Sequence, residues 1–288
     1  MTSNALAGDV NATQELGAFL RSRRERLSPG EVMVPGRRRA RRTPGLRREE
    51  VAELAGVSVD YVTRLEQGRG LRPSTDVLDA LSRALRLSDD ERVYLFDLTQ
   101  RRPAAGRRDT AVPGMLDALV RGLSPLPAML INHRFDIVAW NPEMSALMLG
   151  LDELPARRRN TLWLCLLHPP MVDFYVDRER IIREGIADLR AAWAAYPDDE
   201  ELPRLVAELA SRSEEFARLW ERRDVRVNAR GRKRVRHPVA GPLALDYEVL
   251  VPLGETGHRL VVYRAADTAS QVALDELTTP AAAPAALA

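Results

Sequence analysis

The stretch from Arg47 to Arg69 constrains the fold of this chain more than any other part of it. Two short helical patterns meet at Gly56, and glycine takes a left-handed turn at little cost. Ser58 suits the N-cap of the second helix, which ends at Gly68. Apolar residues recur with helical spacing in this stretch: Val51, Leu54, Val57, Val62 and Leu65. The pattern predicts two helices that share one buried face, a helix-turn-helix.

The outward face of the second helix carries side chains suited to the major groove of DNA. The candidate base-contacting residues are Val59, Asp60, Thr63 and Arg64. The Arg64 guanidinium has the geometry to bind O6 and N7 of guanine, and Asp60 to accept from a cytosine amino group or orient Arg64. Val59 offers methyl groups to thymine, and Thr63 has the reach for bases or phosphates. This face therefore predicts sequence-specific DNA binding.

Flanking side chains predict contacts with the phosphate backbone. The candidates are Arg42, Arg47, Arg48, Tyr61 and Arg69. Such contacts supply salt-dependent affinity but little sequence information. Residues 1–110 hold 21 arginines and 16 acidic residues, whereas the rest holds 22 basic and 25 acidic residues. The basic first part favours a nucleic-acid partner, and the alternative interpretation is a helical hairpin with a solvated charged face.

A chain of 288 residues is long enough for two domains. Its 45% hydrophobic and 29% charged residues are typical of a globular chain. We expect a disordered N-terminus over 1–13, a five-helix DNA-binding domain over 14–100 and a linker over 101–113, where proline, glycine and charge lack periodicity. A second domain is expected over 114–268, followed by a mostly disordered tail over 269–288.

The order of elements in the second domain indicates an antiparallel sheet with helices. Strand patterns cover 128–132 and 137–140, several helical patterns follow, and the expected final strands are 223–228 running into 233–236, 243–251 and 259–264. This is the order of a PAS-like domain, although other α+β folds share it. The predicted class is therefore mainly α with α+β.

Several function classes find no support in the sequence. Cys165 is the single cysteine, which excludes an intrachain disulfide and a cysteine-built metal site. The four histidines show no metal-ligand spacing, and no G-x-S-x-G, P-loop or dinucleotide motif is present. We therefore predict no catalytic residues, no metal and no resident cofactor. With no apolar run long enough for a membrane span and no secretory signal pattern, a cytoplasmic protein without membrane contact is expected.

From about Glu15 to Ala266 the chain resembles bacterial XRE-type (Cro and phage-repressor-like) helix-turn-helix regulators with a C-terminal MmyB-like ligand-binding domain. The segments that carry the resemblance are LRREEVAE (46–53), VDYVTRLEQGR (59–69), VAWNP (138–142), SEEFARLWERRDV (213–225), KRVRHP (233–238), LDYE (245–248) and LVVY (260–263). The resemblance implies a lambda-repressor-like DNA-binding domain and a PAS-like domain that holds a small apolar, fatty-acid-like ligand. Relatives typically carry a histidine where this chain has Arg223, which puts the ligand chemistry of that position in doubt.

Side chains that would line such a ligand pocket are aromatic, aliphatic or basic. The candidates are Trp140, Met144, Trp163, Phe174, Tyr175, Ile182, Ile186, Trp220, Arg223, Arg226 and Tyr247. Most of these residue types also fill ordinary cores. The basic stretch from Arg222 to His237 allows three interpretations: a carboxylate anchor at the pocket mouth, an extra DNA contact or an exposed hairpin.

The sequence as a whole predicts a DNA-binding transcription regulator modulated by a small apolar ligand. A homodimer on a palindromic operator is expected, because one helix-turn-helix reads only a few base pairs. Two other functions stay open. One is a helical protein-interaction regulator that does not bind DNA directly, and the other is a small-molecule-binding protein or enzyme with an accessory helical domain.

Overall fold

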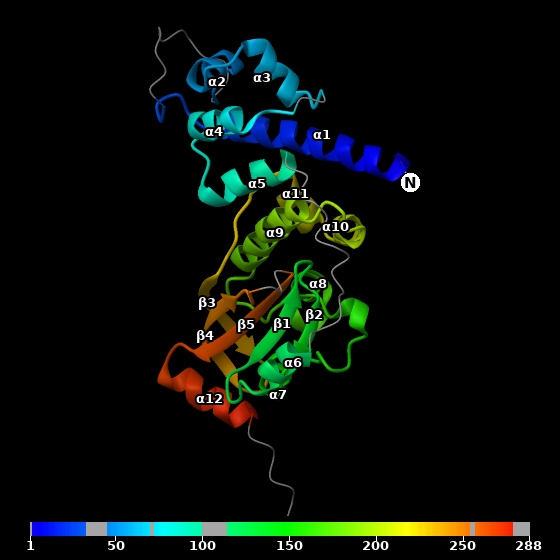
Figure 1. Ribbon diagram of the computed structural model, residues 1–288. Helices are drawn as coiled ribbons and strands as arrows, with labels where there is room; N and C mark the ends of the chain where they lie inside the picture. The colour runs from blue at the N-terminus through cyan, green and yellow to red at the C-terminus, as the bar shows by residue number, and fades with distance from the viewer. Residues whose placement is uncertain (1, 33–44, 70–71, 100–113, 254–256, 279–288) are drawn as a thin grey trace, which may run out of the picture. The chain divides into compact units, whose positions relative to one another are not determined.

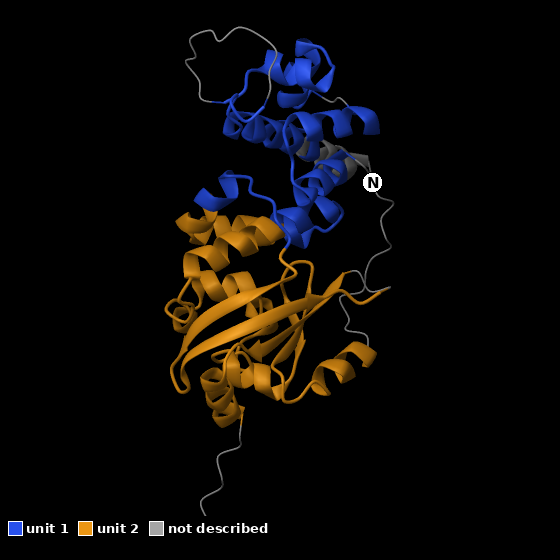
Figure 2. Ribbon diagram, turned by 90° about the vertical axis from the view of Figure 1, so that its left-hand side faces the viewer, with its two compact units in different colours: residues 1–106, 190–204, 218–227 blue, residues 107–189, 205–217, 228–288 orange. Residues whose placement is uncertain are grey.

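The computed structural model describes residues 2–32, 45–69, 72–99, 114–253 and 257–278, with side chains from residue 12 onward. The chain forms two compact units, coloured separately in Figure 2. Unit 1 comprises residues 1–106, 190–204 and 218–227, and unit 2 comprises 107–189, 205–217 and 228–288. Each unit therefore combines segments that are far apart in the sequence. The expected linker over 101–113 lies outside the described residues.

Unit 1 contains the five helices expected for the first domain (Figure 1). They are α1 (Thr2–Arg26), α2 (Arg48–Ala55), α3 (Val59–Glu66), α4 (Thr75–Ala84) and α5 (Asp89–Thr99). Helix α1 begins at Thr2, within the stretch 1–13 for which the sequence analysis expects disorder. No proline interrupts this stretch, so a helix extends through it without a break.

Local signals define the ends of these helices. Gly56 ends α2 in the left-handed conformation, with φ 65°. The Ser58 hydroxyl accepts from the Tyr61 N–H at 3.1 Å and caps α3. Ser88 and Glu91 form a capping box at the start of α5, with distances of 2.9 and 3.3 Å. The helix-turn-helix and its caps are confirmed.

A close approach fixes α1 against the end of α3. A Cβ placed on Gly17 would lie 2.6 Å from the Leu65 carbonyl oxygen and 2.8 Å from that of Glu66. Only glycine allows the two backbones to pack at this distance. Around this point the core of unit 1 is built from buried side chains of the helices, including Leu16, Phe19, Val51, Val62, Leu78 and Leu95.

Unit 2 is built on a five-stranded antiparallel sheet in the order β2-β1-β5-β4-β3. The strands are β1 (Ala128–Asn132), β2 (Ile137–Trp140), β3 (Arg230–His237), β4 (Gly241–Leu250) and β5 (His258–Ala265). The register pairs Met129 with Val261 and Tyr247 with Tyr263. An α-helical unit and an α+β unit confirm the predicted fold class.

Helices of unit 2 lie on both faces of this sheet. They include α6 (Gly114–Arg121), α7 (Pro142–Leu147), α8 (Thr161–Leu167) and α12 (Thr268–Thr278), with 3-10 turns at Ala156–Arg158 and Pro169–Met171. One face forms a small core with α6, in which Val120, Ala128, Leu130 and Leu260 are buried. On the other face, Met129, Ile131 and Val261 line a pocket. Alternation along the strands separates these two sets of side chains.

Three helices are shared between the two units. Residues of both units occur in α9 (Arg178–Ala195), α10 (Glu201–Arg212) and α11 (Glu214–Glu221). One expected strand is wrong here. Residues 223–228 form no strand, because residues 223–227 belong to unit 1 and Arg223 has a left-handed φ of 54°. The expected tail is helical over 269–278, where Asp267 caps α12 by accepting from the Ser270 N–H at 2.8 Å.

Candidate DNA-binding surface and ligand pocket

Helix α3 presents its outward side chains as the sequence pattern predicts. Val59, Asp60 and Arg64 are exposed and Thr63 is half-buried, whereas Val62 and Leu65 are in the core. The Thr63 hydroxyl donates to the Val59 carbonyl at 2.8 Å, which holds that side chain against its own helix. Asp60 lies in the first turn, where the helix dipole favours a negative charge. The exposed face has the composition of a recognition helix.

A buried carboxylate secures the end of α3. The Glu66 side chain, only 2% exposed, accepts from Arg24 Nε at 2.6 Å and from Arg48 Nε at 2.8 Å. Arg21 Nε lies 3.8 Å from the same carboxylate. These arginines belong to α1 and α2, so Glu66 connects three helices. A charge this deeply buried requires such partners, and the cluster fixes the orientation of the recognition helix.

The predicted phosphate contacts are distributed around this motif. Arg47 and Arg69 are exposed and Tyr61 is half-buried. Arg48 is 38% exposed but already pairs with Glu66, so its charge is partly used inside the protein. Arg42 lies outside the described residues.

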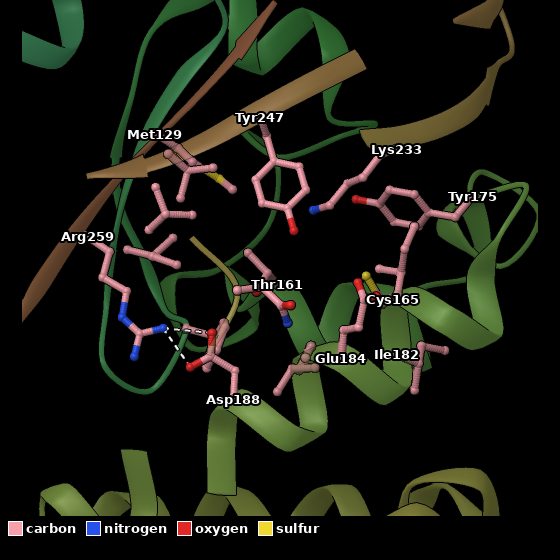
Figure 3. A pocket seen from close by; sticks show the side chains of 18 of the residues that line it. Met129, Thr161, Cys165, Tyr175, Ile182, Glu184, Asp188, Lys233, Tyr247 and Arg259 are labelled. Atoms are coloured by element: carbon pink, nitrogen blue, oxygen red, sulfur yellow. Dashed lines mark hydrogen bonds and ion pairs between the residues drawn. The ribbon is translucent and has the colours of Figure 1, made fainter. Parts of the chain in front are cut away.

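A pocket of unit 2 lies between the sheet and helices α8 and α9, and its empty volume is about 790 Å³ with the solvent at its mouth (Figure 3). The sheet contributes Met129, Ile131, Val249 and Val261, and the helices contribute Leu162, Ile181 and Ile182. These walls are apolar. An apolar pocket with a few convergent polar groups is typical of a small-molecule site.

Lys233 is the only lysine of the chain, and its ammonium lies inside this pocket among tyrosines (Figure 3). Its Nζ donates to the Tyr263 hydroxyl at 2.8 Å. The same atom lies 4.9 Å from the ring centre of Tyr247, 5.3 Å from that of Tyr263 and 5.6 Å from that of Tyr175. Although desolvation alone lowers the pKa of an ammonium, the Tyr263 hydroxyl raises the pKa of Lys233 above its usual value. Lys233 is therefore a cation at neutral pH.

The pocket contains two carboxylates, and each already has an arginine partner. Arg259 Nη1 lies 2.9 Å from both oxygens of Asp188, and Figure 3 shows this ion pair at one end of the pocket. Arg180 Nη1 lies 3.0 and 3.2 Å from the oxygens of Glu184. In the part of the chain that the structure describes, no carboxylate pairs with Lys233. One positive charge in the pocket thus lacks a protein anion.

Cys165 also lines the pocket, next to Tyr175. Burial raises the pKa of the Cys165 thiol and that of the Tyr175 hydroxyl. Both groups therefore stay neutral near pH 7 and offer hydrogen-bonding groups rather than charge. Within the described residues, no group of three or more His, Cys, Asp or Glu side chains is placed to hold a metal ion.

Comparison with known families agrees with both halves of this description. Residues 112–277 match the MmyB-like transcription regulator ligand binding domain, and residues 15–95 match a helix-turn-helix domain. The chain belongs to the MmyB-like transcription regulators. No curated protein matches it. The chain is thus a DNA-binding transcription regulator with a domain for a small-molecule ligand.

The pocket of this MmyB-like regulator includes three of the predicted ligand-lining residues, Tyr175, Ile182 and Tyr247. The others lie elsewhere in unit 2 or in unit 1. Met144, Phe174 and Ile186 are core residues, Trp163 is buried beside His168, and Trp140 donates to Asp152 at 2.8 Å. Trp220, Arg223 and Arg226 belong to unit 1. None of the helices described in this regulator has the length and apolar character of a bilayer span.

Sequence reasoning placed Lys233 in an undivided basic stretch and so missed its position in the MmyB-like domain. The alternation of β3 separates this stretch into two faces. Arg232, Arg234 and Arg236 are exposed, and two of them form ion pairs with Asp246 and Asp177. Lys233, Val235 and His237 have the opposite phase, and the last two are buried. A lysine in phase with buried residues, in a chain whose other basic residues are all arginine, was the available signal.

Proposed function

We propose that this regulator binds a palindromic operator as a homodimer and that an organic acid with an apolar, fatty-acid-like body occupies the pocket of unit 2. The observation that carries the ligand class is the Lys233 ammonium, a cation among apolar walls whose neighbouring carboxylates pair with Arg180 and Arg259. A charge in apolar surroundings is costly unless an opposite charge accompanies it. A ligand carboxylate supplies that charge.

The tyrosines around Lys233 suit the same head group. Tyr263 accepts from Lys233 through its oxygen, so its own proton remains available to a ligand oxygen. Tyr247 adds a second hydroxyl at the pocket wall. Two donors on one carboxylate make charge-assisted hydrogen bonds, which are stronger than neutral ones. The apolar body of the ligand would then lie against Met129, Ile182 and Val261.

For DNA, we assign base contacts to Val59, Asp60, Thr63 and Arg64 and phosphate contacts to Arg47, Tyr61 and Arg69. Their exposure on and around α3 supports this assignment. Arg48 would add to the positive field while it remains paired with Glu66. Because a single α3 reaches only a few base pairs, two copies related by two-fold symmetry are needed for a specific site.

The ligand class is tested by calorimetric titration of delipidated protein with decanoate and with decanol. We expect decanoate to bind about tenfold or more tightly than decanol, as charge-assisted hydrogen bonds of about 1.5–3 kcal/mol require. Lys233→Met should remove this preference and leave decanol binding intact. Arg232→Met, on the outward face of the same strand, is the matched control and should bind like the wild type. Equal affinity of the wild-type protein for acid and alcohol would exclude the proposed head-group site.

DNA binding is tested on the region upstream of the protein's own gene, at two salt concentrations. We expect saturable binding that prefers this region to shuffled DNA and weakens steeply as salt rises. Two copies of the chain should bind each operator. Absence of any preference over random DNA would instead favour the interpretation of the helical domain as a protein-interaction module.

A further inference from the structure

Helix α9 contributes to both units. In unit 2, its residues Ile181, Ile182 and Asp188 line the pocket. From Arg190 onward the same helix belongs to unit 1, where Ala194 is buried in the helical core. Only Leu189 separates the last pocket residue from Arg190. Because a continuous helix is stiff, a displacement of its pocket-lining part reaches Arg190.

Arg190 is a buried arginine of unit 1, with a side chain that is only 2% exposed, and its charge therefore requires partners inside the protein. It forms an ion pair with Glu15 of α1, donates to the Trp220 carbonyl and lies 3.9 Å from the centre of the Trp220 ring. The Tyr94 hydroxyl of α5 donates to the same Glu15 oxygen at 3.0 Å. Loss of these partners would leave a buried charge uncompensated, at a large cost in folding free energy. A displacement of Arg190 therefore either moves α1 with it or breaks the cluster.

The helix that Arg190 holds is also the helix that positions the recognition helix. Glu15 precedes Gly17, where α1 touches the backbone of α3 at Leu65 and Glu66. Arg24, further along α1, binds the Glu66 carboxylate. A rotation or shift of α1 therefore moves the last turn of α3, and with it the exposed Arg64.

A second connection runs through residues 222–227, which we call the strap. The Arg223 carbonyl accepts from the buried Arg23, and Asp224 pairs with Arg26 at 2.6 Å. The Val227 N–H donates to Asp90 of α5 at 3.0 Å. Directly after Val227, Asn228 lines the pocket of unit 2. The strap thus attaches α1 and α5 to the segment that leads into β3.

We propose that α9, acting through the buried Arg190–Glu15 pair, couples occupancy of the pocket to DNA binding. This inference rests on the proposed function, because it takes the pocket as the ligand site and α3 as the DNA-contacting helix. Arg190 is a positioning residue that touches neither ligand nor DNA. The strap binds α1 and α5 at a second place. A displacement of α9 therefore moves α1 instead of rotating the whole helical unit.

The first test measures the DNA affinity of the full chain with and without decanoate. In the wild-type protein we expect decanoate to change the Kd for the operator by about fivefold or more, a typical coupling between sites. Arg190→Met and Glu15→Gln should each reduce this change to less than about twofold while decanoate still binds with wild-type affinity. Arg183→Met, at an exposed position of the same helix, is the matched control and should keep the full change. Retention of the change in both Arg190→Met and Glu15→Gln would overturn the proposal.

The second test needs no disruptive variant. Incorporated 5-fluorotryptophan labels the four tryptophans, and Trp220→Phe assigns the resonance of Trp220. Because Trp220 stacks on Arg190, saturation with decanoate should shift its fluorine resonance. A Trp220 resonance that does not move while calorimetry shows decanoate binding would overturn the proposal, and the proposed ligand class would still stand.

A wrong ligand class can be distinguished from a wrong coupling mechanism by experiment. If neither decanoate nor decanol binds, Gly185→Phe replaces the ligand, because Gly185 lines the pocket and even a Cβ there would lie 2.8 Å from Leu162 Cδ2, so that an aromatic side chain must displace the wall formed by α8 and α9. The variant should then shift the Trp220 resonance and the Kd for the operator together, and the added change Arg190→Met should abolish the effect on Kd. Gly185→Phe that folds but leaves both readouts unchanged would overturn the coupling itself.

Discussion

Arg64 and Arg47 are both exposed residues of the helix-turn-helix, but their positions predict different effects on DNA. Arg64 projects from the exposed face of α3, whereas Arg47 lies at the N-cap of α2. Arg64→Ala should relax the preference at one base pair and cost about 1–3 kcal/mol. Arg47→Ala should weaken binding to every sequence and reduce the salt slope by about one. Binding measured on a set of single-base operator variants at several salt concentrations checks both. A uniform loss in both variants would contradict the assigned roles.

His237 makes the stability of unit 2 sensitive to acid. Its Nδ1 accepts from the N–H groups of Val239 and Ala240 at 3.2 and 3.1 Å, and its Nε2 lies 3.2 Å from the Ala146 carbonyl. The ring is therefore held neutral, and burial lowers the pKa of His237 below its usual value of 6.5. Below that pH the unfolded chain binds a proton that the folded chain does not. Stability should consequently fall as the pH decreases through about 6.5.

The measurement is thermal unfolding of the wild-type chain and of His237→Asn over this pH range. The asparagine side chain keeps an acceptor for the turn N–H groups but does not titrate. We expect the variant to lose less stability than the wild type on acidification. Parallel curves would show that other groups cause the acid sensitivity.

At the scale of elements, the contact between α1 and α3 decides the geometry of the DNA-binding surface. Gly17→Ala raises helix propensity, which alone stabilises by about 0.5–1 kcal/mol. The added methyl group, however, would lie 2.6 Å from the Leu65 carbonyl oxygen and 2.8 Å from that of Glu66. Both are backbone atoms, which cannot move aside as a flexible side chain can. We expect a net loss of about 1–3 kcal/mol, as in overpacked cores, together with weaker operator binding.

Denaturant unfolding and an operator titration measure these two effects. Gly30→Ala is the control, since a Cβ at Gly30 would meet no atom within 4 Å. This control should be close to the wild type in both measurements. A stabilised Gly17→Ala variant would mean that α1 and α3 separate easily and that the contact does not orient the recognition helix.

Features that depend on a local sequence pattern were predictable from the sequence. Features that depend on contacts between residues far apart in the chain were not. The outward face of α3 follows from helical periodicity, and Ser58 caps this helix as its sequence context predicts. Trp220 and Arg223, in contrast, were expected at the ligand pocket but belong to unit 1. Trp220 contacts Arg190, which pairs with Glu15 across a separation of 175 residues, and Arg223 pairs with the same Glu15. Helical or strand periodicity in the sequence does not predict an ion pair between residues so far apart in the chain.

At the scale of the whole molecule, the DNA-binding surface is too small to select a site alone. One α3 exposes a short row of side chains, enough for a few base pairs. The proposed homodimer resolves this limit if its two α3 helices reach major grooves on one side of the duplex. Half-sites should then lie about 10 bp apart, or a multiple of that distance.

Inserting about 5 bp between the half-sites should abolish operator binding, because half a turn places one groove on the opposite side of the DNA, and inserting about 10 bp should restore part of it. Footprinting of the three operators, with sedimentation to give the number of chains bound, measures this. Decanoate should change the affinity for the spaced operators in the same direction as for the native one, because α9 acts within each chain. An affinity independent of spacing would mean that each chain binds DNA alone.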